Sequence, residues 1–153
     1  MTGSITKTPD SRLKTLDSRL QTSDSQLKTN YSYYPGCTLH STSREYDVSA
    51  RMVFEALGLG LHEIEGWTCC GAGVAQTFDP LLALALPARD IDIASHKGLP
   101  IAVACAKCFS RLKTSSMALK DEKKAKDIAK ALDKENIKPI EVLHMIQILD
   151  PGK

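Results

Sequence analysis

Apolar and polar positions follow two different periods along residues 31–150, and the way these periods take turns predicts an α/β fold. The segment YSYYPGC, residues 31–37, is a β-prone aromatic run closed by proline and glycine, which is typical of a short strand ending in a turn. Apolar residues then recur at helical spacing over residues 46–57, and Thr42 and Glu45 have the spacing of a capping box. We therefore expect a strand followed by a helix that packs on the core.

The same alternation continues through the middle of the chain. Residues 61–65, LHEIE, predict a second strand, and residues 99–105, LPIAVAC, predict a buried third strand. Residues 79–98, between these strands, have the composition of a helix. We expect this helix to be broken or kinked at Pro87, because proline removes an interior hydrogen bond.

Three helices are predicted after the third strand. Residues 106–120 form the first, residues 121–137 form a charged amphipathic one, and Pro139 opens the last, over residues 140–149. The mixed charges of the middle helix predict a solvated face rather than a docking patch. Strands that alternate with helices indicate a mainly parallel sheet flanked by helices, in one domain over residues 31–150.

The first 30 residues have a different pattern. DSRLKTL, DSRLQTS and DSQLKTN follow one another over residues 10–30 as a tandem seven-residue repeat. A coiled coil needs two apolar positions in each heptad, whereas here only one leucine recurs, at Leu13, Leu20 and Leu27. We therefore expect residues 1–30 to form a solvated or disordered tail, with a short helix as the alternative. We interpret the repeat as a tandem DNA repeat translated ahead of the domain, with no chemical role.

Composition narrows the classes of function. The 153 residues carry a formal net charge of +2, and 5% of them are aromatic, which does not provide the basic surface or stacking platforms of a nucleic-acid-binding protein. The longest apolar stretch, residues 80–88, is far shorter than the ~20 residues that cross a bilayer, so no membrane span is expected. The first 20 residues lack the apolar core of a secretory signal. This favours a cytoplasmic location, with free or metal-bound thiols rather than disulfides.

Five cysteines have the clearest chemistry in the chain. Their spacing is C-x31-CC-x34-C-x2-C. They are Cys37, Cys69, Cys70, Cys105 and Cys108. Each group follows a predicted strand, and ligand sites in open α/β sheets gather at the carboxyl ends of the strands. We therefore expect the five thiols to converge at one edge of the sheet.

The adjacent pair favours a site with more than one metal atom. A structural zinc site uses four ligands, which leaves one of the five thiols over. Neighbouring residues in extended chain point to opposite sides, so Cys69 and Cys70 suit two metal atoms or one cluster edge. Gly71 and Gly73 are expected to let the backbone bend close to the sulfurs, and a helix start at Cys105–Cys108 is expected to lower thiolate pKa values. An opportunistic zinc site and a vicinal-disulfide redox switch are the alternatives.

Other polar residues are weaker candidates. The four histidines share no ligand spacing, and we expect them in surface or core roles. They are His40, His62, His96 and His144. Lys107 and Arg111 follow the last cysteine pair, where we expect solvated helix charges; attraction of an anion or stabilisation of a reduced cluster is the alternative. Tyr33 and Tyr34 are expected to pack the first strand rather than to shield a metal centre.

Two long segments resemble the B-type polypeptide of heterodisulfide reductase and its bacterial relatives. They are YYPGCTLHSTSREYDVSARMVFEALGLGLHEIEGWTCCGAG and ALALPARDIDIASHKGLPIAVACAKCFSRLK. That family carries a cysteine-rich CCG motif with five cysteines at matching spacing, and the resemblance covers about residues 31–150. It implies a noncubane [4Fe-4S] cluster, with the adjacent pair divided between irons of the fused cluster. The implied ligands are Cys37, Cys69, Cys70, Cys105 and Cys108.

The resemblance also implies a function and partners. The B-type polypeptide of that family usually contains two CCG repeats in about twice this length, and the present chain matches the first. It resembles an iron–sulfur redox subunit that transfers electrons toward disulfide reduction. The implied partners are a flavin and iron–sulfur subunit of the A type, an iron–sulfur subunit of the C type, or a second CCG half. Alternatives are a noncatalytic, metal-stabilised fragment or assembly module, and a CCG electron-transfer subunit of another oxidoreductase.

Overall fold

The sheet of this protein is parallel and four-stranded, in the order β2-β1-β3-β4. The computed structural model describes residues 29–150; the tail predicted from the repeat lies, up to residue 28, outside the described residues, as do residues 151–153. The strands are β1 (Thr29–Tyr34), β2 (Leu59–Glu63), β3 (Ile101–Val103) and β4 (Val142–His144). The predicted α/β class with a parallel sheet is confirmed.

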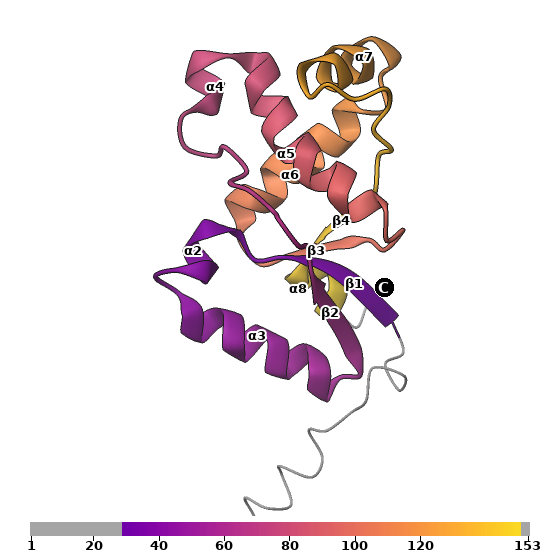
Figure 1. Ribbon diagram of the computed structural model, residues 1–153. Helices are drawn as coiled ribbons and strands as arrows, with labels where there is room; N and C mark the ends of the chain where they lie inside the picture. Colours follow the sequence, from indigo (N-terminus) through magenta and orange to yellow (C-terminus); the bar gives the residue numbers. More distant parts are fainter. Residues whose placement is uncertain (1–28, 151–153) are drawn as a thin grey trace, which may run out of the picture.

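Helices cover both faces of the sheet. After β1 come α2 (Gly36–His40) and α3 (Arg44–Ala56), and after β2 come α4 (Ala75–Phe78) and α5 (Pro80–Ser95). After β3 come α6 (Ala106–Ala118) and α7 (Glu122–Ala131), and after β4 comes α8 (Met145–Leu149). Figure 1 shows α3 and α8 below the sheet and α4 to α7 above it. A parallel sheet needs such cover, because its strands are apolar on both faces.

Two tyrosines at the end of β1 anchor the two layers of the core. Successive side chains of a strand point to opposite faces, so neighbouring tyrosines enter different layers. Tyr33 packs with Phe54 and Met145 on the side of α3 and α8, whereas Tyr34 packs with Leu112 on the side of α5 and α6. Both tyrosine side chains are 0% exposed. Their expected packing role agrees with this arrangement.

Several predicted boundaries move by a few residues. β1 begins at Thr29, two residues before the predicted domain start, and β2 begins at Leu59 instead of residue 61. The predicted capping box at Thr42 does not form, because Ser43 is the N-cap of α3 and its side chain makes no capping hydrogen bond. The predicted helix itself is present as α3. Within residues 29–150, no helix combines the length and the apolar character needed to cross a bilayer.

The end of the chain differs from the prediction of a helix over residues 140–149. Val142–His144 instead forms β4, and only Met145–Leu149 is helical. Val142 pairs with Ile101, and His144 pairs with Val103, so the segment adds a fourth strand to the sheet. A strand of three residues is too short to show an alternating pattern, so its apolar residues cannot be told apart from those of the helix that follows.

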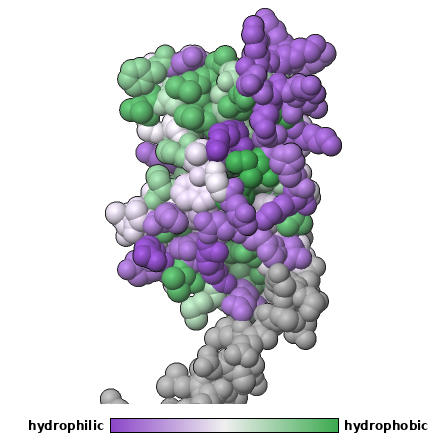
Figure 2. All heavy atoms as spheres, in the orientation of Figure 1, coloured by the Kyte–Doolittle hydropathy of each residue, from purple (hydrophilic) through white to green (hydrophobic). Residues whose placement is uncertain are grey.

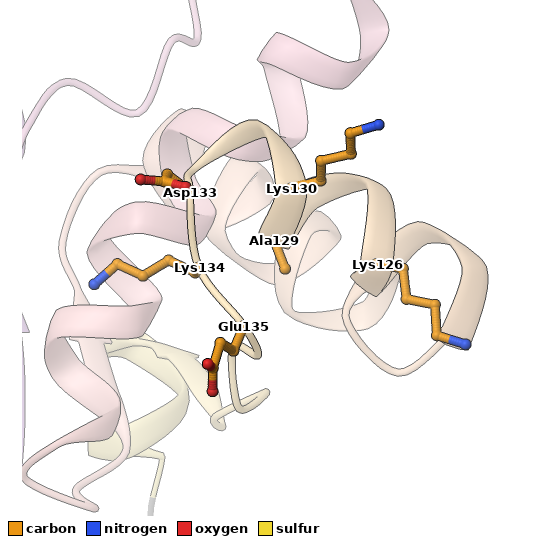
Figure 3. A pocket seen from close by; sticks show the side chains of 6 residues that line it. All are labelled: Lys126, Ala129, Lys130, Asp133, Lys134 and Glu135. Carbon is orange, nitrogen blue, oxygen red and sulfur yellow. The ribbon is translucent and has the colours of Figure 1, made fainter.

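The charged helix α7 is shorter than predicted, because it ends at Ala131 rather than near residue 137. Asp133 takes a left-handed conformation with a φ of 53°, which helical residues do not adopt. Hydrophilic residues gather over this part of the molecule in Figure 2. Figure 3 shows Lys126, Lys130 and Lys134 pointing away from one another around a shallow hollow. They do not converge on an anion, which agrees with the expected solvated face.

Pro87 does not break α5, which runs without interruption from Pro80 to Ser95. Proline has no N–H, so the carbonyl of Ala83, four residues earlier, loses its helical hydrogen-bond donor. The guanidinium of Arg111 replaces that donor: its Nη2 donates to the carbonyl oxygen of Ala83 at 2.7 Å. Arg111 is 8% exposed, so the expectation of a solvated charge was wrong at this position. A buried donor from α6 keeps α5 continuous.

We expect Arg111→Met to lower the unfolding free energy by about 2 kcal/mol, because the buried carbonyl of Ala83 is left without a donor. The loss should be smaller in a Pro87→Ala background, where residue 87 supplies a helical N–H to the same carbonyl. Urea unfolding of the four chains of this double-mutant cycle measures the coupling. Additive effects of the two substitutions would contradict the assigned contact.

Candidate metal centre

The strand order brings the cysteine-bearing loops to one edge of the sheet. β1 lies between β2 and β3, and Tyr34 at its end is paired with Val103 at the end of β3. The chain leaves β1 toward α3 on one face and leaves β3 toward α6 on the other face. In open α/β sheets this divergence opens a crevice at the carboxyl ends of the two strands. Cys37 follows β1, and Cys105 follows β3, at that edge.

The deepest part of this edge holds Cys70 and Cys108. Their sulfur atoms lie 3.2 Å apart, and the side chains are 2% and 5% exposed. Cys105, half-buried at the N-cap of α6, also hydrogen-bonds to Cys108. Cys37 and Cys69 are exposed. The structure therefore brings three of the five predicted residues into contact and places the other two on the surface of neighbouring loops.

The two buried thiols have opposite pKa shifts. The hydrogen bond from Cys108 lowers the pKa of Cys70 to about 6, with further help from the backbone N–H of Ala72. The same hydrogen bond, together with burial, raises the pKa of Cys108. The expectation that the start of α6 lowers thiolate pKa values was therefore wrong for Cys108, because its nearest neighbour is another ionisable sulfur. One thiolate that accepts from a neighbouring thiol is the preferred state of the metal-free pair.

Two glycines let the backbone approach the sulfur atoms. Gly36 has a φ of 74°, and a Cβ at this position would lie 3.1 Å from the sulfur of Cys108. Gly71 has a φ of 70°, and a Cβ there would lie 2.8 Å from Cδ1 of Leu86. Gly71 therefore provides the bend expected after the adjacent cysteines. Gly73 has no atom within 4 Å of such a Cβ, so it has no comparable role.

We expect Gly71→Ala to destabilise the metal-free chain by about 2 kcal/mol, because alanine is strained at this φ and overlaps Leu86. Gly73→Ala is the matched control, because the space around it is open, and its effect should stay within about 0.5 kcal/mol. Urea unfolding under reducing conditions measures both. Equal effects of the two substitutions would contradict the close approach at Gly71.

The segment just before the adjacent cysteines is held by residues that the sequence did not single out. The hydroxyl of Tyr34 donates to the carbonyl oxygen of Thr68 at 2.6 Å, and Asp90 of α5 accepts from the backbone N–H of Thr68 at 2.8 Å. The signal for Asp90 was available, since it lies at helical spacing from the buried residues Ala83 and Ala94. A carboxylate on such a face indicates a specific partner.

The other candidate residues have structural contacts. The ring of His40 packs against Trp67 at 5.5 Å, and Nε2 of His62 lies 2.9 Å from Oδ1 of Asn30. His144 caps α8 by accepting from the N–H of Ile146. His96 is the C-cap residue of α5. Lys107 is exposed on α6, as expected of a solvated charge.

The donor set at this edge suits a sulfur-ligated polynuclear centre better than a single ion. Across residues 29–150, no group of three or more histidine, cysteine, aspartate or glutamate side chains is arranged to hold a metal ion. Thiolates are the usual ligands of iron–sulfur clusters, which are larger than one ion and have more widely spaced ligands. The N–H of Ala72 directed at Cys70 and the close approach of Gly36 to Cys108 fit such a group.

Comparisons with known proteins agree with this arrangement. A membrane anchor subunit of 8-methylmenaquinol:fumarate reductase from Wolinella succinogenes is 37% identical over 97 residues, which are 63% of this chain and 34% of that protein. A protein from Archaeoglobus profundus that is named for its likeness to the B-type polypeptide of heterodisulfide reductase is 30% identical over 83 residues, 54% of this chain and 28% of that protein. The chain thus spans about a third of the length of these curated relatives.

A solved structure shares the fold. The crystal structure of a hypothetical protein from Helicobacter pylori superposes with a TM-score of 0.67 at 12% identity, over 93% of this chain and 31% of that chain. The family model described as the cysteine-rich domain CCG matches residues 31–113, a range that includes all five cysteines. The chain belongs to the CCG cysteine-rich domain family, and within it resembles the B-type polypeptide of heterodisulfide reductase.

Proposed function

We propose that this chain is an iron–sulfur redox subunit that transfers electrons toward the reduction of a disulfide. In this proposal the ligands of a noncubane [4Fe-4S] cluster are Cys37, Cys69, Cys70, Cys105 and Cys108. The observation that carries the proposal is the meeting of Cys70, Cys105 and Cys108 at the ends of β2 and β3, beside Gly36 at the end of β1. Membership of the CCG family and the likeness to the heterodisulfide reductase-like protein of Archaeoglobus profundus support it.

Each part of the site has a role in this proposal. A bound cluster supplies one-electron chemistry, and its potential depends on ligand charge, burial and hydrogen bonds to sulfur. Burial of Cys70 and Cys108 keeps water from the inner side, and the N–H of Ala72 stabilises negative charge on the sulfur of Cys70. Cys69 and Cys37 are exposed, so the outer side is where an electron acceptor approaches.

The first test is the iron and acid-labile sulfide content of the full chain, purified and reconstituted without oxygen. We expect about four irons and four sulfides per chain, as a [4Fe-4S] cluster requires, with an electron paramagnetic resonance signal. Zinc alone, or metal-free thiols after reconstitution, would overturn the proposal. Zinc would return the interpretation to the alternative of a mononuclear site, which four of the five thiols suffice to build.

Partners are part of the proposal, because the chain spans about a third of its curated relatives. We propose that electrons arrive from a flavin and iron–sulfur subunit of the A type through an iron–sulfur subunit of the C type, or that a second CCG half completes the acceptor site. The setting proposed for this electron transfer is the cytoplasm. Co-purification of the tagged chain with such subunits from its own cells tests this arrangement, and recovery of the chain alone would contradict it.

A second candidate function is supported by the likeness to the Wolinella succinogenes protein, at 37% identity over 97 residues. In that case the chain is a CCG electron-transfer subunit that exchanges electrons with a quinol-linked oxidoreductase. The two candidates differ in the oxidant that the reduced chain accepts. Rapid reoxidation of the dithionite-reduced, cluster-loaded chain by a small organic disulfide supports the first, and rapid reoxidation only by a menaquinone analogue supports the second.

A further inference from the structure

A buried carboxylate of α5 contacts the loop that carries the adjacent cysteines. Asp90 is 0% exposed, and its Oδ1 accepts two hydrogen bonds from Thr68, one from the backbone N–H at 2.8 Å and one from the hydroxyl at 3.2 Å. Thr68 directly precedes Cys69 in the sequence. One carboxylate oxygen therefore fixes both the main chain and the side chain of the residue that enters the CCG motif.

Two further residues hold the same segment from other directions. The hydroxyl of Tyr34, at the end of β1, donates to the carbonyl oxygen of Thr68 at 2.6 Å. Nη1 of Arg89 donates to the carbonyl oxygen of Gly66 at 3.0 Å and to the hydroxyl oxygen of Thr68 at 3.3 Å. Thr68 is thus held on its N–H, its carbonyl and its hydroxyl, and the peptide leading to Cys69 has little freedom.

The cost of keeping Asp90 points to a specific use. The second carboxylate oxygen, Oδ2, is buried and has no hydrogen-bond partner among the described residues, and Nη1 of Arg89 lies 3.7 Å from Oδ1. A buried carboxylate with an unsatisfied oxygen destabilises a fold unless its contacts are needed. The contacts it does make all end on Thr68 or its holder Arg89.

We propose that Asp90 is a positioning residue for the CCG motif: by holding Thr68 it fixes Cys69 and Cys70 in place before any cluster is bound. Ligands that are held in place lose less conformational freedom on binding, and the loss of residues that orient metal ligands typically costs about 10–100-fold in affinity. The effect on iron rests on the proposed function. The effect on the thiols of the metal-free chain rests on the fold alone.

The test compares three variants of the full chain with the wild type. Asp90→Ala removes the acceptor. Asp90→Asn keeps an oxygen in the same place and removes the charge. Asp92→Ala is the matched control, because Asp92 lies on the same helix and pairs with Lys134 instead of the CCG loop. Circular dichroism establishes that each chain is folded before the thiols are measured.

The main readout is the rate at which Cys70 of the reduced, metal-free chain reacts with a thiol reagent, resolved by mass spectrometry. Cys70 is 2% exposed, so its reaction requires the loop to open. We expect Asp90→Ala to react at least about tenfold faster than the wild type, and Asp90→Asn and Asp92→Ala to stay within about threefold of it. Equal rates for Asp90→Ala and Asp92→Ala would overturn the proposal.

Two other measurements decide the proposal separately. Amide hydrogen exchange at Thr68 of the wild-type chain should be slow, since this N–H donates to a buried oxygen; fast exchange there overturns the proposal even if Asp90→Ala does not fold. In the reconstituted chain, Asp90→Ala should release iron to a chelator at least about tenfold faster than Asp92→Ala. A chain that takes up no iron ends the proposed function, whereas the thiol rates still decide the role of Asp90.

Discussion

Replacing Cys70 with serine is expected to abolish cluster loading of this chain and to leave its helical content intact. Cys70 is the most buried of the five thiols, and its sulfur lies 3.2 Å from that of Cys108. A serine hydroxyl is not ionised at neutral pH and is a poor ligand for iron compared with thiolate. Because serine has nearly the same volume as cysteine, the packing around it changes little.

The measurement is the iron and sulfide content of anaerobically reconstituted Cys70→Ser, together with its electron paramagnetic resonance and far-ultraviolet circular dichroism spectra. Ser110→Ala is the matched control: it changes one oxygen atom on the exposed side of α6, two residues after Cys108, and should load as the wild type does. Wild-type iron, sulfide and spectrum in Cys70→Ser would show that this residue is not a ligand.

The second large expected effect concerns stability and pH. Burial raises the pKa of Asp90 from its ordinary value of 3.8 to about 6. The hydrogen bonds from Thr68 and the charge of Arg89 oppose this rise, and the charge of Cys70 adds to it. A carboxyl with a raised folded-state pKa stabilises the fold fully only below its unfolded pKa, and this contribution is lost as pH rises through the folded pKa. The loss amounts to about 3 kcal/mol.

We therefore expect Asp90→Asn to be more stable than the wild type at neutral pH, relative to their difference at pH 4, by about 3 kcal/mol. Urea unfolding of both metal-free, reduced chains at a series of pH values measures the change. The difference should grow between pH 4 and 6 and stay constant above pH 7. Asp92→Asn controls for the loss of a negative charge on α5. Parallel curves for the wild type and Asp90→Asn would show that burial does not affect Asp90 in this way.

The sequence predicted the elements that carry the cysteines, because each lies in a long, regular pattern. The aromatic run at Tyr31–Tyr34, the helical spacing over residues 46–57 and the apolar run before Cys105 correspond to β1, α3 and β3. Punctuation by glycine and proline marked where these elements end. The edge of the sheet at which the thiols gather followed from the rule for parallel strands rather than from any single residue.

Features that depend on distant partners could not be read from local patterns. Proline in a helix predicts a break, yet Pro87 is accommodated because Arg111, on another helix, supplies the missing donor. Val142–His144 became a strand because an open edge of β3 was available to pair with it. The pairing of Cys70 with Cys108, which raises one pKa and lowers the other, likewise requires that two loops meet.

The separation of the three cysteine-bearing loops along the chain determines when the site comes into existence. The loops that carry Cys37, Cys70 and Cys108 meet only after β1 has paired with β2 on one side and with β3 on the other. Such long-range contacts form late in folding, so a nascent chain emerging in order presents its thiols singly. Iron and sulfide therefore have to be delivered to a chain that has already folded, and any fault in sheet assembly would appear in the cell as a failure of cofactor maturation.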